Sequence, residues 1–169
     1  MKMLTMPIAL LLLLSGLCWP LAGLALQSDR GQPIQLEADS ADINEKTGIS
    51  VYTGHVDITQ GSMHIRAHKL VVEQRKGKGT RLVATGKPVY FRQRPDPGKP
   101  EVKGHALRAE YNSGSELLIL SGDAVLKQGK DSFSNDRIVY DRVKGLVKAG
   151  KSAKGKSRVK ITIDPNNRR

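Results

Sequence analysis

One eight-residue segment has the residue types and spacing of a phosphate-binding loop. Residues 145–152 read Gly-Leu-Val-Lys-Ala-Gly-Lys-Ser, which fits the Gly-x-x-x-x-Gly-Lys-Ser/Thr pattern of nucleotide-binding proteins. Such a loop needs a helix after it, because the first N–H groups of that helix bind the phosphates. Residues 153–158 contain glycine, serine and three basic residues, which is a poor start for a helix. A similar phrase, Leu-Val-Ala-Thr-Gly-Lys, occurs at 82–87, so we interpret the segment as a repeated strand and turn.

The histidines are the candidates for metal binding. His64 and His68 lie four residues apart in a predicted strand and would therefore share one face. A zinc site needs further ligands, and the spacing does not bring His55 or His105 to them. The single cysteine, Cys18, lies close to the N-terminus. We expect exposed strand histidines and no metal or other cofactor.

Two carboxylates, Glu37 and Asp39, could serve as the acid and base of a glycoside hydrolase. No Gly-x-Ser-x-Gly nucleophile motif accompanies them. We favour the interpretation that both residues are solvated strand positions, because no pattern in the sequence separates an acid from a base. A secreted hydrolase with this pair remains an alternative.

The first 25 residues resemble a secretory signal. Lys2 precedes an apolar stretch centred on residues 8–14, and Gly23-Leu24-Ala25 offers small residues for cleavage. A retained membrane anchor is one alternative, and a lipoprotein acylated on Cys18 is another, although Leu17 stands where a small residue is preferred. Export of the remaining chain makes ATP and nucleic acid poor partners.

The rest of the chain alternates apolar and polar residues with the period of two that is typical of β-strands. Gly, Asn and Asp punctuate it every eight to twelve residues, which indicates many short strands in a sandwich, roll or barrel. By this alternation ten apolar residues would face inward: Ile34, Leu36, Tyr52, Val56, Ile58, Phe91, Tyr111, Leu120, Leu126 and Phe133. They could form a closed core, or an open roll with a slot for acyl chains.

A shift of 68 residues superposes one part of the chain on another. Tyr52-Thr53-Gly54 then falls on Leu120-Ser121-Gly122, and Gln60-Gly61 falls on Gln128-Gly129, with the apolar alternation kept in between. The chain is therefore predicted to contain two copies of one unit of several strands. Stacked copies would bury a continuous interior and leave unpaired edge strands at both ends. The first strand, predicted over 32–38, has few residues that block such pairing.

The positive charge is concentrated near the C-terminus. The chain has 28 Lys and Arg against 16 Asp and Glu, a net charge of +12. Residues 144–169 hold nine of the basic residues and one acid, Asp164. We expect a solvated, partly disordered end that could also attract anionic headgroups or phosphorylated sugars. Beyond residue 25 the chain has no Trp and two Phe, so base stacking by nucleic acid is not supported.

Several phrases together resemble a known family. Residues 32–39 (Gln-Pro-Ile-Gln-Leu-Glu-Ala-Asp), 52–61 (Tyr-Thr-Gly-His-Val-Asp-Ile-Thr-Gln-Gly) and 86–88 (Gly-Lys-Pro) are similar to the LptA family of OstA-like proteins, the periplasmic bridges of lipopolysaccharide export. The resemblance covers roughly residues 30–163. It implies an all-β fold, an open, twisted antiparallel β-jelly roll that binds lipid A acyl chains in its interior without catalysis.

The resemblance also implies partners and positions. Head-to-tail strand addition would join copies of the chain to one another, to an LptC-like inner-membrane protein and to an LptD-like outer-membrane translocon. Ile34, Phe91 and Tyr111 match positions that meet the lipid, and the strand around Ile34 matches an edge that accepts a partner. Ser113 and the lysine-rich segment 144–160 depart from the family pattern.

We therefore predict a signal peptide over 1–25, an OstA-like β-jelly roll over 26–163 and a disordered basic tail over 164–169. The ten inward residues are the predicted lipid-binding site, and the periplasm is the predicted location. The main alternative is a periplasmic structural protein whose basic tail binds an anionic cell-wall polymer.

Overall fold

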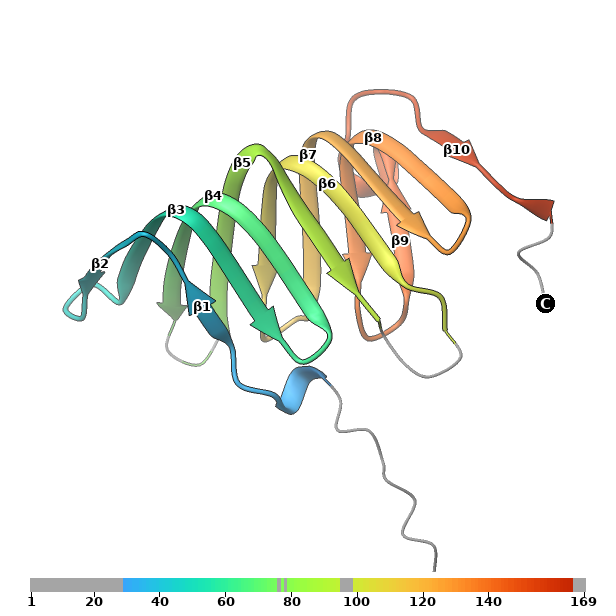
Figure 1. Ribbon diagram of the computed structural model, residues 1–169. Helices are drawn as coiled ribbons and strands as arrows, with labels where there is room; N and C mark the ends of the chain where they lie inside the picture. Colours follow the sequence, from blue (N-terminus) through green and yellow to red (C-terminus); the bar gives the residue numbers. More distant parts are fainter. Residues whose placement is uncertain (1–28, 76, 78, 95–98, 166–169) are drawn as a thin grey trace, which may run out of the picture.

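The computed structural model describes residues 29–75, 77, 79–94 and 99–165. These residues form one folded antiparallel sheet with two short 3₁₀ helices (Figure 1). The elements in chain order are η1 (Asp29–Gly31), β1 (Gln35–Glu37), β2 (Ser40–Asn44), β3 (Ile49–Gln60), β4 (Met63–Arg75), β5 (Gly79–Gln93), β6 (Val102–Asn112), β7 (Leu117–Gln128), β8 (Asp131–Asp141), β9 (Leu146–Ala149), η2 (Gly150–Ala153) and β10 (Lys160–Thr162). The predicted all-β, open jelly roll is confirmed.

The six long strands lie side by side in chain order, from β3 to β8. Two short strands border each end of this series: β1 and β2 pair with β3, and β9 and β10 pair with β8. The sheet therefore does not close on itself, and it has an edge at either end.

Each long strand bends near its middle, so that the sheet folds over into two layers (Figure 1). The register of every long-strand pair shifts at the bend, for example between Thr53 and Val56 and between Ser121 and Ala124. We call one layer the β2 arm and the other the β1 arm. The β2 arm holds β2, β9 and residues 49–53, 69–75, 79–85, 108–112, 117–121 and 137–141. The β1 arm holds β1, β10 and residues 56–60, 63–66, 89–93, 102–105, 124–128 and 131–135.

The predicted repeat is visible in the backbone. When 68 is added to the residue numbers of β3 (49–60), the result is the range of β7 (117–128). The bend of β3 then falls at the bend of β7. At both bends a glycine with positive φ, Gly54 (77°) and Gly122 (76°), precedes a second positive-φ residue. This conformation favours glycine, and a Cβ on Gly54 would lie 2.1 Å from the Asp39 carboxylate. The same backbone device thus folds both copies.

Apolar side chains fill the space between the arms. Val56, Ile58, Leu70, Leu118, Leu120 and Leu126 are each at most 1% exposed, and Tyr111 and Tyr140 pack among them. No helix among the described residues is long and apolar enough to cross a membrane. The predicted signal peptide lies outside the described residues and stays a prediction.

Two sequence expectations need correction. The first strand covers only Gln35–Glu37 rather than 32–38, since Pro33 has no N–H for a ladder. The basic segment is ordered through Pro165, not partly disordered from residue 144, because β9, η2 and β10 pack against β8. At the start of the predicted tail, Asp164 N–H donates to the Asp131 carboxylate at 3.0 Å, and the boundary of the tail stays a prediction. Residues 166–169 lie outside the described residues.

Candidate functional site

The interior between the arms collects nearly all of the predicted site residues. Six belong to the buried core: Val56, Ile58, Phe91, Tyr111, Leu120 and Leu126. Leu36, Tyr52 and Phe133 are partly buried and pack against it. Ile34 is the exception, since it precedes β1 and is 38% exposed. The inward orientation is therefore wrong for Ile34, and whether any of the ten binds lipid stays a prediction.

The interior in this conformation is packed by the protein's own side chains. The six fully enclosed site residues come from both arms and are 0–2% exposed. Protein interiors packed to this degree have little free volume, so a guest molecule must displace side chains or separate the arms. Any binding between the arms thus depends on what holds their free ends together.

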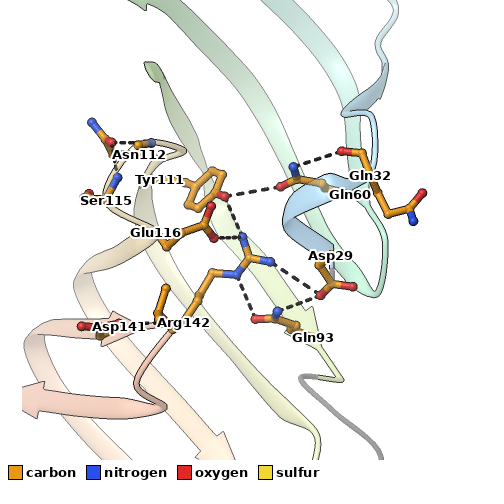
Figure 2. Close-up of polar contacts among 12 residues, drawn as sticks. Asp29, Gln32, Gln60, Gln93, Tyr111, Asn112, Ser115, Glu116, Asp141 and Arg142 are labelled. Carbon is orange, nitrogen blue, oxygen red and sulfur yellow. Dashed lines mark hydrogen bonds and ion pairs between the residues drawn. The ribbon is translucent and has the colours of Figure 1, made fainter. Parts of the chain in front are cut away.

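A polar cluster joins the free ends of the two arms (Figure 2). Arg142 follows β8 in the β2 arm, and its side chain is 3% exposed. It donates to Glu116 Oε2 at 3.0 Å and to the Tyr111 hydroxyl at 2.7 Å, both in the same arm. It also donates to Gln93 Oε1 at 3.0 Å, at the end of the β1 arm. We call this cluster the clasp.

Asp29 in η1 completes the clasp from the N-terminal side. Its carboxylate lies 3.6 Å from the Arg142 guanidinium and accepts a hydrogen bond from Gln93 Nε2 at 2.8 Å (Figure 2). It also accepts from Ser62 N–H at 2.6 Å, in the turn between β3 and β4. The segment that leads into β1 is thereby tied to the residue that follows β8.

The environment of the clasp changes the pKa of one of its members, Tyr111. Burial raises the pKa of Tyr111 to about 12, and the adjacent Glu116 carboxylate acts in the same direction. The Tyr111 hydroxyl lies 3.4 Å from Gln60 Oε1 at the end of β3, so it too reaches across to the β1 arm. Removal of one partner from a buried ion pair leaves an uncompensated charge, which destabilises proteins strongly.

The N-terminal edge of the sheet is exposed along its length. All five residues of β2 are exposed, and in β1 only Leu36 is partly buried. Residues 32–46 hold four acids (Glu37, Asp39, Asp42 and Glu45) and one base, Lys46, for a net charge of −3. Unpaired backbone groups on such an edge can accept a further strand.

The C-terminal edge is held in place by two neighbouring side chains of β8. Asn135 Nδ2 donates to the Ser157 and Arg158 carbonyls at 3.2 and 3.1 Å, and its Oδ1 accepts from Gly150 N–H at 3.0 Å. Asp136 accepts from Lys156 N–H at 2.8 Å, and this bond lowers the pKa of Asp136 to about 2. Residues 144–163 hold seven bases and no acid.

The structure places the chemical motifs of the sequence on separate elements. The Gly-x-x-x-x-Gly-Lys-Ser segment is β9 followed by the four-residue 3₁₀ helix η2, so the strand-and-turn prediction is confirmed. His64 precedes the register shift in β4 and His68 lies within it. The expected shared strand face stays a prediction. Within the described part of the chain, no group of three His, Cys, Asp or Glu could hold a metal ion. Glu37 and Asp39 are exposed at the N-terminal edge.

Comparison with known proteins decides the family. The family described as LptA/(LptD N-terminal domain) LPS transport protein matches residues 35–146. The chain belongs to this LptA family. It is 37% identical over 130 residues to the lipopolysaccharide export system protein LptH of Pseudomonas aeruginosa, covering 76% of this chain and 74% of LptH. The LptA of Haemophilus influenzae is 37% identical over 145 residues, covering 84% of this chain and 83% of that protein.

The solved structures agree with the sequence relatives. The crystal structure of Pseudomonas aeruginosa LptH, the LptA homologous periplasmic component of the lipopolysaccharide transport device, superposes with a TM-score of 0.75 at 33% identity. The match covers 82% of this chain and all of that one. The LptA-family match ends at Leu146, so the basic C-terminal edge lies almost wholly beyond it.

Proposed function

We propose that the chain is a non-enzymatic periplasmic bridge that binds lipopolysaccharide and carries it from the inner to the outer membrane. The observation that carries the proposal is an open, folded sheet with an apolar interior and an edge at either end. Its relatives are lipopolysaccharide export system proteins, which supports the cargo. A periplasmic relative, LptH, and the predicted signal peptide support a periplasmic location.

The acyl chains of the cargo would lie between the arms, against the ten predicted site residues. Burial of apolar chains is favourable by about 0.8 kcal/mol per CH₂ group. Because the interior is already packed, entry requires the arms to separate, and the clasp is the polar cluster that joins their free ends. A cargo held this way is exchangeable, since the core side chains replace it when it leaves.

The strand directions support head-to-tail assembly. β1 and β10 both belong to the β1 arm, and β2 and β9 both belong to the β2 arm. If two copies stack in the same orientation, β10 of one meets β1 of the next in antiparallel direction, and β9 meets β2 likewise. The sheet then continues with its own alternation, and the interior extends from copy to copy.

Charge complementarity supports the same arrangement. The N-terminal edge carries a net charge of −3 over 32–46, and the C-terminal edge carries +7 over 144–163. Opposite charges at facing edges favour encounter in the head-to-tail orientation and disfavour contact between like ends. The free edges at the ends of a stack would pair with an LptC-like inner-membrane protein and an LptD-like outer-membrane translocon.

The test is lipopolysaccharide binding by the full chain at high salt. Salt screens exposed charges but leaves apolar burial intact. The matched variant replaces three exposed lysines of the C-terminal edge, Lys154, Lys156 and Lys160, with Gln. Saturable binding by both proteins is expected. Binding that disappears with salt or with these lysines would instead indicate a protein that binds an anionic polymer through its basic edge.

A further inference from the structure

Three cationic side chains form a row across three neighbouring strands on the outer surface of the β1 arm. Arg92 on β5 faces Lys103 on β6, and Lys103 faces Lys127 on β7. Like charges in directly opposite positions of neighbouring strands destabilise a sheet. Among the described residues Arg92 and Lys127 form no ion pair, and Lys103 has only the exposed Glu101 carboxylate at 3.7 Å. We call this row the cation ladder.

The outer surface of the β2 arm is built differently. There Arg81 donates to Glu73 at 2.8 Å and to Glu110 at 2.6 Å, and Arg108 donates to Glu110 at 2.9 Å. Although burial alone would raise it, these hydrogen bonds from the two arginines lower the pKa of Glu110. Opposite charges alternate in this arm, so a row of three cations with a single acidic partner is not a general feature of the sheet.

The cation ladder borders a groove of about 300 Å³, and no Asp or Glu among the described residues lines it. Tyr90 and His105 lie in the adjacent row, with ring centroids 6.4 Å apart, and Arg66 stacks over Tyr90 at 5.6 Å. Tyr90 is 49% exposed although it lies mid-strand. His64 also lines the groove, and its Nε2 is hydrogen-bonded to the Asp57 carboxylate. An exposed aromatic ring beside cations with a single acidic partner is the feature that a ligand with an apolar face and an anionic group requires.

We propose that this groove binds a phosphorylated sugar. Lys and Arg favour phosphate oxygens, and Arg92 can bind them in a bidentate manner. The C–H face of a sugar ring fits against the flat, amphipathic ring of Tyr90. The site lies on the outer surface, opposite to the side chains that fill the interior, so it does not rest on the proposed acyl-chain site. The ligand could be the saccharide of a lipopolysaccharide or a free sugar phosphate, which share this chemistry.

The experiment is calorimetric titration of the full chain with four probes. These are fully deacylated lipopolysaccharide, the same saccharide after removal of its phosphates, glucose 6-phosphate and inorganic phosphate. The test variant is Lys103→Gln/Lys127→Gln, and the matched control is Lys69→Gln/Lys87→Gln, which removes two exposed lysines of the central strands outside the groove and outside both edges. We expect the phosphorylated saccharide to bind, with at least tenfold weaker affinity for the test variant and unchanged affinity for the control.

The other probes locate the source of the affinity. Tighter binding of the saccharide than of glucose 6-phosphate assigns the groove to lipopolysaccharide, and equal binding assigns it to sugar phosphates in general. Equal binding of inorganic phosphate or of the dephosphorylated saccharide overturns the proposal, and so does an equal loss of affinity in both variants.

The melting temperature of the protein without ligand is a second readout. If the cations of the ladder repel one another until an anion binds, Lys127→Gln raises the melting temperature. A fall in the melting temperature contradicts the proposal. Acyl-chain binding by the test variant stays unchanged, so failure here is distinguishable from failure of the proposed function.

Discussion

The two ends of the folded sheet are alike in architecture and opposite in charge. At each end a long strand is bordered by two short ones of three to five residues, one in each arm. The N-terminal edge is acidic and tied down by Asp29, whereas the C-terminal edge is basic and tied down by Asn135 and Asp136. Short edge strands have few ladder hydrogen bonds, so side-chain anchors position them. The difference in charge gives a stack of copies a direction.

The largest expected effect comes from breaking the clasp, which joins the free ends of the two arms. We predict that Arg142→Met lowers the free energy of unfolding by about 3–5 kcal/mol, because the buried carboxylate of Glu116 loses its ion pair with the Arg142 guanidinium. The control is Arg108→Met, whose side chain is 41% exposed, with an expected loss below about 1 kcal/mol. Urea unfolding measures both. Equal losses for the two variants would show that the clasp is an ordinary surface ion pair.

The second prediction uses the pH dependence of the clasp. Burial raises the pKa of Tyr111 from 10 to about 12, so its contribution to stability is complete below pH 10 and is lost as the pH rises toward 12. Arg142, Glu116 and Gln60 face its hydroxyl. We expect the native protein to lose about 2 kcal/mol more than Tyr111→Phe between pH 9 and 12. Parallel stability curves for the two proteins would contradict the assignment.

A smaller effect is expected from reversing the charge of two residues at one end. Lys148→Glu/Lys160→Glu should weaken self-association at least about tenfold, or roughly 1.4 kcal/mol, because two new acidic side chains then face the acidic N-terminal edge and the net charge of residues 144–163 falls from +7 to +3. Mixing this variant with Glu37→Lys/Asp42→Lys should restore the contact between them. Lys69→Glu/Lys87→Glu changes the same charge on exposed residues of the central strands and serves as the control in sedimentation velocity. If the mixture associates no better than either variant alone, the ends do not recognise each other by charge.

The smallest effect compares the two anchors. Asp136→Asn should speed amide hydrogen exchange at Lys156 and Ser157, which donate to this carboxylate, and leave β1 unaffected. Asp29→Asn should do the reverse, with faster exchange at Ser62. Because the pKa of Asp136 is held near 2, the C-terminal protection should persist above about pH 4 and decline as the pH falls toward 2. Protection that changes at both ends in each variant would show that the anchors are not independent.

The fold could be predicted from sequence because its rules are local. The period of two placed the inward side chains, and the recurrence of Gly54 at Gly122 marked a repeated bend. The alternation rule was wrong for Ile34, because the rule holds only within a paired strand and pairing starts at Gln35. The ordered structure of the basic segment could not be predicted from local alternation either. It depends on hydrogen bonds to Asn135 and Asp136 that link residues 15 to 23 positions apart.

The clasp and the cation ladder could not be predicted in this way. Arg142 meets Asp29, Gln93 and Glu116 only after the sheet has folded over, and no motif connects those positions. Opposition of Lys103 and Lys127 likewise depends on the register of β6 and β7, which follows from the bend. One signal of the clasp was available in the sequence, namely the polar residues Gln60 and Gln93 at the ends of apolar strands. The structure shows that both side chains are buried rather than exposed.

The central claim is that the cargo lies between the arms, and photo-crosslinking tests it most directly. A photoreactive phenylalanine replaces buried Phe91 in one protein and Leu107, which is 47% exposed on the outer surface, in another. Each is irradiated with radiolabelled lipopolysaccharide at high salt. The account predicts a crosslinked adduct from position 91 and none from position 107. An adduct from position 107 alone would contradict it and place the lipid outside the roll.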